Sequence, residues 1–309
     1  MPKTLTYNAT LVAREDCNDG LAIFKVRPDE FAPGVDWFIP GQYLTLGLNN
    51  EKQPALGPVR RPMSIASPPD QPDTVDFYIR YVSQPESDNP LTHLLWDLQE
   101  GDRLHISARP TGRFTVHHST GEEDTRRRIL VAAGTGLAPF TSMVFADIAA
   151  NAKVDLSNWV ILHAASYPDD IGYRTELEAL TRSNGLRYAP SISRPAEAPE
   201  WEAHTGRVED FFALDRLADT ERVSGLAPGE LTPEHAVIYI CGLNGTIANC
   251  LERLLPRGFV PNHRKIRRAL QVPDEVTSSF FFEPYDNTPV VDIKSEENTA
   301  RLRALMPHN

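Results

Sequence analysis

Residues 128–255 alternate between apolar runs and segments with helical spacing, and this alternation constrains the fold more than any other feature of the chain. Each apolar run is short and lacks a polar face, as in a strand that is covered on both sides. Strands of this kind that alternate with helices predict a parallel, doubly wound sheet. The predicted strands are RILVAA (128–133), NWVILHAAS (158–166), LRYAPSIS (186–193) and AVIYICG (236–242), and the predicted helices cover 138–152, 174–183 and 246–255.

The first third of the chain has a different pattern, with short β-rich runs separated by turn residues. Six such runs at this spacing predict a small antiparallel β-barrel, interrupted by one helix at 90–99. The runs cover 5–15, 21–28, 42–48, 60–67, 75–82 and 102–110. The polar segment 117–128 separates the two patterns and predicts a domain boundary. We therefore expect a β-barrel domain at 1–122, an α/β domain at 123–278 and a C-terminal extension at 279–309.

Composition and charge exclude several classes of protein. The net charge of -11 argues against a nucleic-acid-binding protein. Cys17, Cys241 and Cys250 form no CxxC pair and are too few for a disulfide framework or a plant-type iron–sulfur centre. No G-x-S-x-G motif and no cluster of metal ligands occurs, so we expect neither a hydrolase nor a metal site. The absence of a long apolar stretch predicts a cytoplasmic protein without a membrane contact.

The motif GTGLAP (134–139) lies where the first predicted parallel strand meets a helix. Glycines there let the backbone approach a pyrophosphate, and free N–H groups at the helix start point toward it. The same turn also occurs for topological reasons alone, and Pro139 occupies the third glycine position of G-x-G-x-x-G. Two companions favour a nucleotide site. They are the stretch RPMS (61–64), with an arginine and a hydroxyl, and Cys241-Gly242 at the end of the last predicted parallel strand.

Nine stretches in this order resemble the bacterial type of the ferredoxin–NADP⁺ reductase family over residues 5–260. They are RRPMSIAS, DFYIRYV, PLTHLL, ARPTGRFTV, AAGTGLAPF, VILHAAS, SISR, HTGRV and YICG. The resemblance implies that the barrel binds FAD and that the α/β domain binds NADP(H). It also implies hydride transfer between NADPH and FAD, with single electrons passing to or from ferredoxin or flavodoxin, which are acidic carriers.

The resemblance also implies the FAD site. Arg61 would neutralise the pyrophosphate, and Ser64 would bond the flavin edge. Met63 stands where the family has a tyrosine that stacks on the flavin, so the packing there differs from the family pattern. The family usually has glycine where Asn89 or Pro90 stands. The implied FAD-binding set is Arg61, Pro62, Met63, Ser64, Tyr78, Ile79, Arg80, Tyr81, Pro90, Leu91, Thr92, Thr135, Phe282 and Tyr285.

A second implied set binds NADP(H). Arg194 and Arg207 would select NADPH over NADH through its 2′-phosphate, whereas Ser166 stands where the family has a third arginine. Cys241 would shape the nicotinamide slot beside the flavin, and Glu283 would relay a proton to the reduced flavin; these two are the expected catalytic residues. The implied NADP-binding set is Thr135, Gly136, Ala165, Ser166, Ser193, Arg194, Arg207, Cys241, Gly242 and Leu243.

The last part of the chain leaves more than one interpretation open. The aromatic run at 280–285 either caps a core or stacks on the flavin or the adenine. If it stacks on the flavin, removal of 279–309 should strengthen NADPH binding. Basic runs at 126–128 and 264–268 are either solvated or steer an acidic partner. Two other functions stay open: the reductase component of an oxygenase, and a non-catalytic module that senses flavin or nucleotide.

Overall fold

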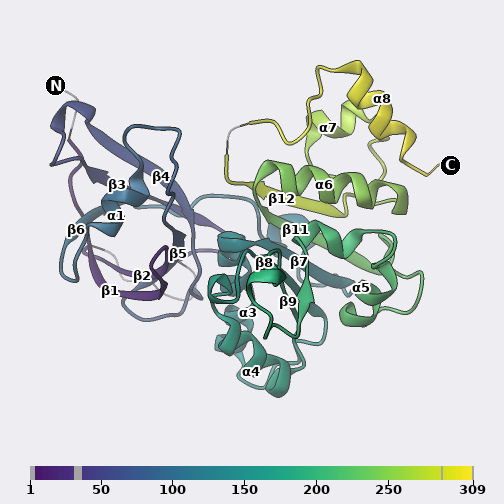
Figure 1. Cartoon of the computed structure of the whole chain (residues 1–309), viewed down its shortest axis with the longest axis horizontal. Coiled ribbons are helices and arrows are strands. Elements are labelled where there is room, and N and C mark those ends of the chain that lie inside the picture. Colours follow the sequence, from purple (N-terminus) through teal and green to yellow (C-terminus); the bar gives the residue numbers. More distant parts are fainter. Residues whose placement is uncertain (1–3, 31–36, 287, 308–309) are drawn as a thin grey trace. The chain divides into compact units, whose positions relative to one another are not determined.

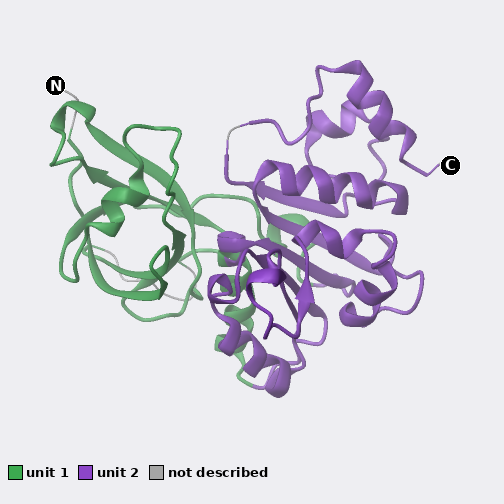
Figure 2. Ribbon diagram, viewed as in Figure 1, with its two compact units in different colours: residues 1–122, 138–152 green, residues 123–137, 153–309 purple. Residues whose placement is uncertain are grey.

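The structure, a computed structural model, describes residues 4–30, 37–286 and 288–307. The chain forms two compact units (Figure 2). Unit 1 contains residues 1–122 and 138–152, and unit 2 contains residues 123–137 and 153–309. The expected division differs in two places. The contacts group 138–152 with unit 1, and they leave 279–309 inside unit 2 and not as a separate extension.

Unit 1 is built on six antiparallel strands in the order β4-β3-β6-β1-β2-β5. Alternate residues of β3 face the core, since Leu44, Leu46 and Leu48 are all buried. The chain beyond β4 joins the opposite edge of the sheet, where the Ala66 N–H donates to the Asp76 carbonyl at 2.8 Å. The sheet therefore curls into the predicted barrel (Figure 1). The strands are β1 (Ala9–Asn18), β2 (Leu21–Pro28), β3 (Tyr43–Asn49), β4 (Pro58–Ser64), β5 (Val75–Arg80) and β6 (Arg103–Ile106), with helices α1 (Leu91–Trp96) and α2 (Val116–Ser119).

Helix α3 (Ala138–Ala150) follows the glycine turn in sequence and packs within unit 1. Two of its hydroxyl groups, both fully buried, hold it to the chain after β4. Thr141 Oγ1 donates to the Ala66 carbonyl at 3.0 Å, and Ser142 Oγ donates to the Ser67 carbonyl at 2.8 Å. Because buried hydroxyls need partners, these two bonds explain why polar residues occur on this otherwise apolar helix face.

Unit 2 is built on a six-stranded parallel sheet in the order β10-β9-β8-β7-β11-β12 (Figure 1). This sheet confirms the predicted doubly wound class and adds two edge strands, β10 and β12, that the sequence pattern did not indicate. The strands are β7 (Arg127–Ala133), β8 (Trp159–Ala165), β9 (Arg187–Ile192), β10 (His204–Thr205), β11 (Ala236–Gly242) and β12 (Phe280–Pro284). The helices are α4 (Arg174–Asn184), α5 (Leu217–Ser224), α6 (Asn244–Leu254), α7 (Arg264–Ala269) and α8 (Glu296–Ala304).

The aromatic run at 280–285 is a strand of this sheet and not a free tail. Phe280 pairs with Ile238, and Phe281 pairs with Tyr239 in parallel register. Phe280 is completely buried, and the Phe281 ring stacks on Tyr239 with 5.2 Å between ring centroids. Of the two interpretations of the run, Phe280 and Phe281 therefore fit the core role. Burial of these apolar side chains against β11 stabilises the edge strand.

Helix α8 completes the core of unit 2. Its Leu302 is 2% exposed and belongs to the same hydrophobic cluster as Phe280. Ser295 caps the helix by accepting a hydrogen bond from the Asn298 N–H at 3.2 Å. Helix α8 therefore helps to stabilise unit 2.

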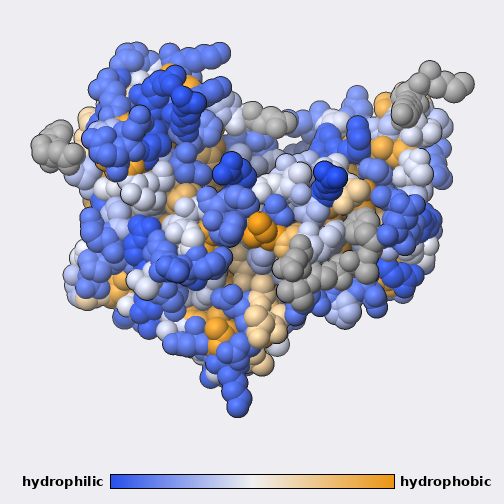
Figure 3. Space-filling view, turned by 180° about the vertical axis from the view of Figure 1, so that it is seen from behind, coloured by the Kyte–Doolittle hydropathy of each residue, from blue (hydrophilic) through white to orange (hydrophobic). Residues whose placement is uncertain are grey.

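The surface is mostly hydrophilic on the face drawn in Figure 3, where hydrophobic residues form small groups. Among the described residues, no helix is both long enough and apolar enough to cross a bilayer.

Candidate functional site

The glycine turn η2 (Gly134–Leu137) lies directly against the end of strand β11. A Cβ atom added to Gly136 would lie 2.0 Å from the Cys241 carbonyl oxygen, so only glycine permits this approach. Gly134 has φ +54°, and a Cβ atom there would meet nothing within 4 Å. The fold thus brings Thr135 and Gly136 together with Cys241, from motifs that are about a hundred residues apart in sequence.

A buried histidine holds the turn in place from strand β8. His163 Nε2 lies 3.1 Å from the Gly134 carbonyl, and its Nδ1 lies 3.3 Å from the Tyr188 hydroxyl. Since a carbonyl only accepts, Nε2 carries the proton and Nδ1 accepts from Tyr188. Burial lowers the pKa of His163 to about 4, which keeps the ring neutral. His163 is not among the site residues predicted from the sequence, although a polar residue inside a two-sided apolar strand is a signal of this kind of role.

Three predicted residues gather at the carboxyl ends of β7, β11 and β12. Cys241 pairs in register with Glu283, and the Tyr285 N–H donates to the Gly242 carbonyl at 3.1 Å. The Thr135 and Cys241 side chains both influence the pKa of the Tyr285 hydroxyl, which places them near it. Cys241, Thr135 and Tyr285 therefore lie near one another at this edge of the sheet.

Burial decides the protonation of this group. Cys241 is completely buried, and burial together with the nearby Glu283 carboxylate raises the pKa of its thiol well above the ordinary value. The thiol is therefore protonated and is not a nucleophile. Burial likewise raises the pKa of the Tyr285 hydroxyl, although 44% of the Tyr285 surface is exposed. The site presents neutral Cys and Tyr side chains beside one carboxylate.

Phe282 and Leu243, two further predicted residues, have different surroundings. Phe282 packs against the hydrophobic core of unit 2, with 6.0 Å between the centroids of its ring and that of His263. Leu243 is 60% exposed and immediately precedes helix α6. Core packing therefore accounts for Phe282 without a ligand.

A second group of predicted residues follows strands β8, β9 and β10. The Ser193 N–H donates to the Ala165 carbonyl at 2.9 Å, and the Arg194 N–H donates to the Ser166 carbonyl at 3.2 Å. Arg194 and Arg207 each stand two residues beyond the end of a strand, and those two strands are paired in parallel. Both exposed arginines therefore follow the same edge of the sheet.

Arg194 lies against Tyr167, which is not among the site residues predicted from the sequence. Its guanidinium donates to the Tyr167 hydroxyl, and its Cζ lies 5.2 Å from the centroid of the Tyr167 ring. The Tyr167 hydroxyl in turn donates to the Glu197 carboxylate at 3.1 Å. Tyr167 thus orients Arg194 through a hydrogen bond and a cation–π contact.

In unit 1 the predicted residues occupy the two edge strands, β4 and β5, and the start of α1. Arg61 is exposed and donates to the Arg60 carbonyl at 2.9 Å, and among the described residues no carboxylate pairs with it. Met63 packs against the barrel core. The remaining positions are Pro62 and Ser64 on β4, Tyr78, Ile79 and Arg80 on β5, Tyr81 just after it, and Pro90, Leu91 and Thr92 at the start of α1.

Two of these positions have other contacts. The Tyr81 ring stacks on His93 at 4.5 Å between centroids, and the Tyr81 N–H donates to the Gly20 carbonyl. Thr92 is 8% exposed, and its hydroxyl accepts a hydrogen bond from the Val82 N–H at 3.4 Å. These contacts fix the shape of the segment between β5 and α1.

The chain is similar to several known proteins. Residues 130–252 match the family model described as an oxidoreductase NAD-binding domain. Ferredoxin–NADP reductase B of Sorangium cellulosum is 33% identical over 210 residues, which are 68% of this chain and 76% of that protein. Reductase component 1 of terephthalate 1,2-dioxygenase from Comamonas is 28% identical over 56% of this chain and 46% of that protein.

Among solved structures, a ferredoxin NADP⁺ reductase from Neisseria gonorrhoeae with bound FAD and NADP shares the fold. Its TM-score is 0.70 at 20% identity, over 90% of this chain and 98% of that one. The two folds and the glycine turn define a two-unit oxidoreductase with a nucleotide-binding α/β unit. Within that class, the chain belongs to the ferredoxin–NADP⁺ reductase family.

Proposed function

We propose that this chain is a flavoenzyme that transfers hydride between NADPH and FAD and exchanges single electrons with a small carrier protein. FAD would bind to unit 1 and NADP(H) to unit 2. The observation that carries the proposal is the close approach of Gly136 to Cys241. The hydrogen bond between His163 and the Gly134 carbonyl holds the same turn in place. This packing keeps a glycine turn at the carboxyl edge of a parallel sheet, where nucleotides bind in such folds.

The residues of unit 2 fit a dinucleotide. The open space beside Gly134 leaves room at the turn, and Thr135 and Gly136 would receive the pyrophosphate and the nicotinamide end. Cys241 and Gly242 would form a wall of the nicotinamide slot. Because its thiol is protonated, Cys241 would contribute shape and exclude water and would not react covalently.

Two cations in unit 2 fit the additional phosphate of NADPH. Arg194 is exposed and already oriented by Tyr167, and Arg207 follows the neighbouring strand. Charge-assisted bonds from arginine to phosphate are among the stronger polar contacts. Ser166 would offer only a hydroxyl where the family has a third arginine. We therefore propose Arg194 and Arg207 as the residues that select NADPH over NADH.

The residues of unit 1 fit FAD. Arg61 has no carboxylate partner among the described residues and would neutralise the pyrophosphate. Ser64 would bond the flavin edge, and Met63 would lie against the ring in place of the family's tyrosine. Strands β4 and β5 stand at the two ends of the strand order, and their outer edges would face the ligand.

When bound, FAD supplies the hydride and single-electron chemistry. The chain would position the two nucleotides, exclude water and hold a proton. Glu283 is the carboxylate of the site, and it is paired in register with Cys241. We propose that Glu283 holds and releases the proton that balances reduction.

The electron carrier is proposed to be ferredoxin or flavodoxin, and the protein is proposed to act in the cytoplasm. A second candidate is the reductase component of an oxygenase, which the similarity to the terephthalate dioxygenase component favours. Measuring electron transfer from the NADPH-reduced protein to purified ferredoxin, flavodoxin or an oxygenase subunit would separate these candidates.

The decisive experiment is the visible spectrum of the purified protein before and after anaerobic addition of NADPH. We expect flavin absorption that NADPH bleaches, and FAD on chromatography of the released cofactor. Arg61→Gln should lower the FAD content, whereas Arg60→Gln serves as a matched control, because neighbouring residues on a strand point to opposite faces. A bound flavin that NADPH does not bleach would instead favour a sensing module, and FMN as the main released species would contradict the FAD site.

A further inference from the structure

Helix α7 in unit 2 carries three exposed cations that the fold does not use. Arg264, Lys265 and Arg268 are exposed, and none of their side chains forms an ion pair or a hydrogen bond with a described residue. Elsewhere in unit 2, several arginines pair with carboxylates: Arg126 with Asp124, Arg253 with Asp210, Arg257 with Glu221 and Arg301 with Glu252. In a chain with a net charge of -11, three neighbouring cations without a carboxylate need a separate explanation.

The positions of Arg264 and Lys265 disfavour the helix that carries them. Arg264 and Lys265 lie in the first turn, where the positive end of the helix dipole repels cations. Arg264 and Arg268 are four residues apart on the helix and repel each other. Packing of α7 depends instead on Ile266, which is 3% exposed. Neutral polar residues would therefore serve the fold better at 264 and 265, whereas Arg268, in the last turn, is favoured by the helix dipole and repelled by Arg264.

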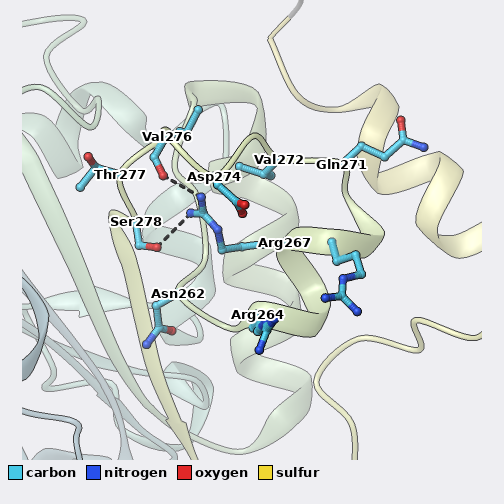
Figure 4. A pocket seen from close by; sticks show the side chains of 10 residues that line it. Asn262, Arg264, Arg267, Gln271, Val272, Asp274, Val276, Thr277 and Ser278 are labelled. Carbon is cyan, nitrogen blue, oxygen red and sulfur yellow. Dashed lines mark hydrogen bonds between the residues drawn. The ribbon is translucent and has the colours of Figure 1, made fainter.

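The fourth cation of the helix has a structural role. Arg267 donates to the Ser278 hydroxyl at 3.0 Å, to the Pro273 carbonyl at 2.9 Å and to the Val276 carbonyl at 2.7 Å. Figure 4 shows its guanidinium directed toward residues 276–278. Arg267 thus holds the loop after α7 and is not available to a ligand.

The surroundings favour a broad surface over a pocket for one small anion. A hollow of about 740 Å³ lies beside α7 and is lined by Arg264, Arg268, Asn262 and Thr277, but also by the Asp274 carboxylate. That carboxylate disfavours a free anion inside the hollow. Arg264, Lys265 and Arg268 are distributed along the helix, and this arrangement matches several separate carboxylates on a partner.

We propose that α7 and the loop after it form a docking surface for an acidic protein segment. Carboxylates of that segment would pair with Arg264, Lys265 and Arg268, and Asn262 and Thr277 would donate or accept hydrogen bonds at the edge. The surface lies outside residues 130–252, the part that matches the NAD-binding family model. The proposal does not depend on the proposed redox function, since it concerns a different surface of unit 2.

The test uses the full chain and a fluorescein-labelled peptide of alternating Glu and Ser. We expect binding by fluorescence anisotropy at low salt, with an affinity that falls as salt rises. The triple variant R264Q/K265Q/R268Q should bind at least about tenfold more weakly, because three surface ion pairs are lost. The matched control R182Q/R222Q/R301Q removes the same charge from other exposed arginines and should bind as the unaltered chain does.

Cross-linking of the unaltered chain provides a test that needs no variant. A carbodiimide should join the peptide to Lys265 and not to the exposed Lys52 or Lys294. Equal weakening by the two triple variants, cross-links spread over all three lysines, or displacement of the peptide by equimolar inorganic pyrophosphate would each overturn the proposal. Reduction of bound flavin by NADPH should be the same in both variants, and this measurement keeps the result separate from the redox proposal.

Discussion

Replacing Gly136 by alanine tests the central packing of the candidate site. The added Cβ atom would lie 2.0 Å from the Cys241 carbonyl oxygen, whereas such contacts are essentially never closer than 3.0 Å. The turn or the end of β11 must therefore move by about 1 Å. Overpacking of this kind costs about 1–3 kcal/mol in the free energy of unfolding.

Gly134→Ala is the matched control in the same turn. Its Cβ atom would meet nothing within 4 Å, so the only penalty is the left-handed backbone at φ +54°, about 1–2 kcal/mol. Both substitutions reduce the freedom of the unfolded chain equally, and that contribution cancels between them. Gly136→Ala therefore displaces the turn, whereas Gly134→Ala leaves it in place, and a comparison of the two variants isolates the effect of the displacement.

The assays are urea unfolding and calorimetric titration with NADP⁺. We expect Gly136→Ala to weaken NADP⁺ binding by on the order of tenfold to a hundredfold, because a shift of about 1 Å misplaces the groups that face the pyrophosphate. Gly134→Ala should lose stability and bind NADP⁺ within about threefold of the unaltered chain. Equal NADP⁺ affinity for the two variants would refute the argument that the approach of Gly136 to Cys241 positions the site.

Three further predictions concern the coenzyme, pH and the end of the chain. Replacing both Arg194 and Arg207 by alanine should raise KM for NADPH by on the order of a hundredfold, since each phosphate contact contributes roughly 1.5–3 kcal/mol. KM for NADH should stay nearly the same. Steady-state kinetics with each coenzyme check this, and an equal rise of KM for both coenzymes would contradict the prediction. The pKa of His163 is depressed from 6.5 to about 4 by folding. The stability that depends on its neutral ring is therefore complete above pH 6.5 and falls by about 3 kcal/mol as the pH drops toward 4. In urea unfolding at a series of pH values, the free energy of unfolding of His163→Gln should fall less steeply below pH 6.5 than that of the unaltered chain. An equally steep fall in both would contradict the assignment of this pH dependence to His163. Deleting 289–309 should lower the free energy of unfolding by at least about 1.5–3 kcal/mol, because Leu302 is buried. Urea unfolding checks this, and unchanged stability of the shortened chain would contradict the packing of helix α8 in the core of unit 2.

Local pattern alone predicts much of this fold. The alternation of apolar residues along β3 indicates a strand that is buried on one face, and the continuous apolar run of β7 indicates a strand that is buried on both faces. The antiparallel and the parallel sheet can therefore both be predicted without tertiary information. The glycine turn after β7 can also be predicted from the sequence, because glycine has the backbone freedom that such a turn requires. These features depend on a residue and its near neighbours in sequence.

The sequence by itself determined the two kinds of sheet, the glycine turn and the types of residue at the candidate sites. Only the tertiary structure decided that the aromatic run is strand β12, that helix α3 packs with unit 1, and that His163 holds the Gly134 carbonyl. It also decided that Tyr167 orients Arg194. Each of these depends on contacts between residues that are distant in sequence or on opposite sides of a loop, and local periodicity has no information about which partner a buried strand or a polar side chain will find.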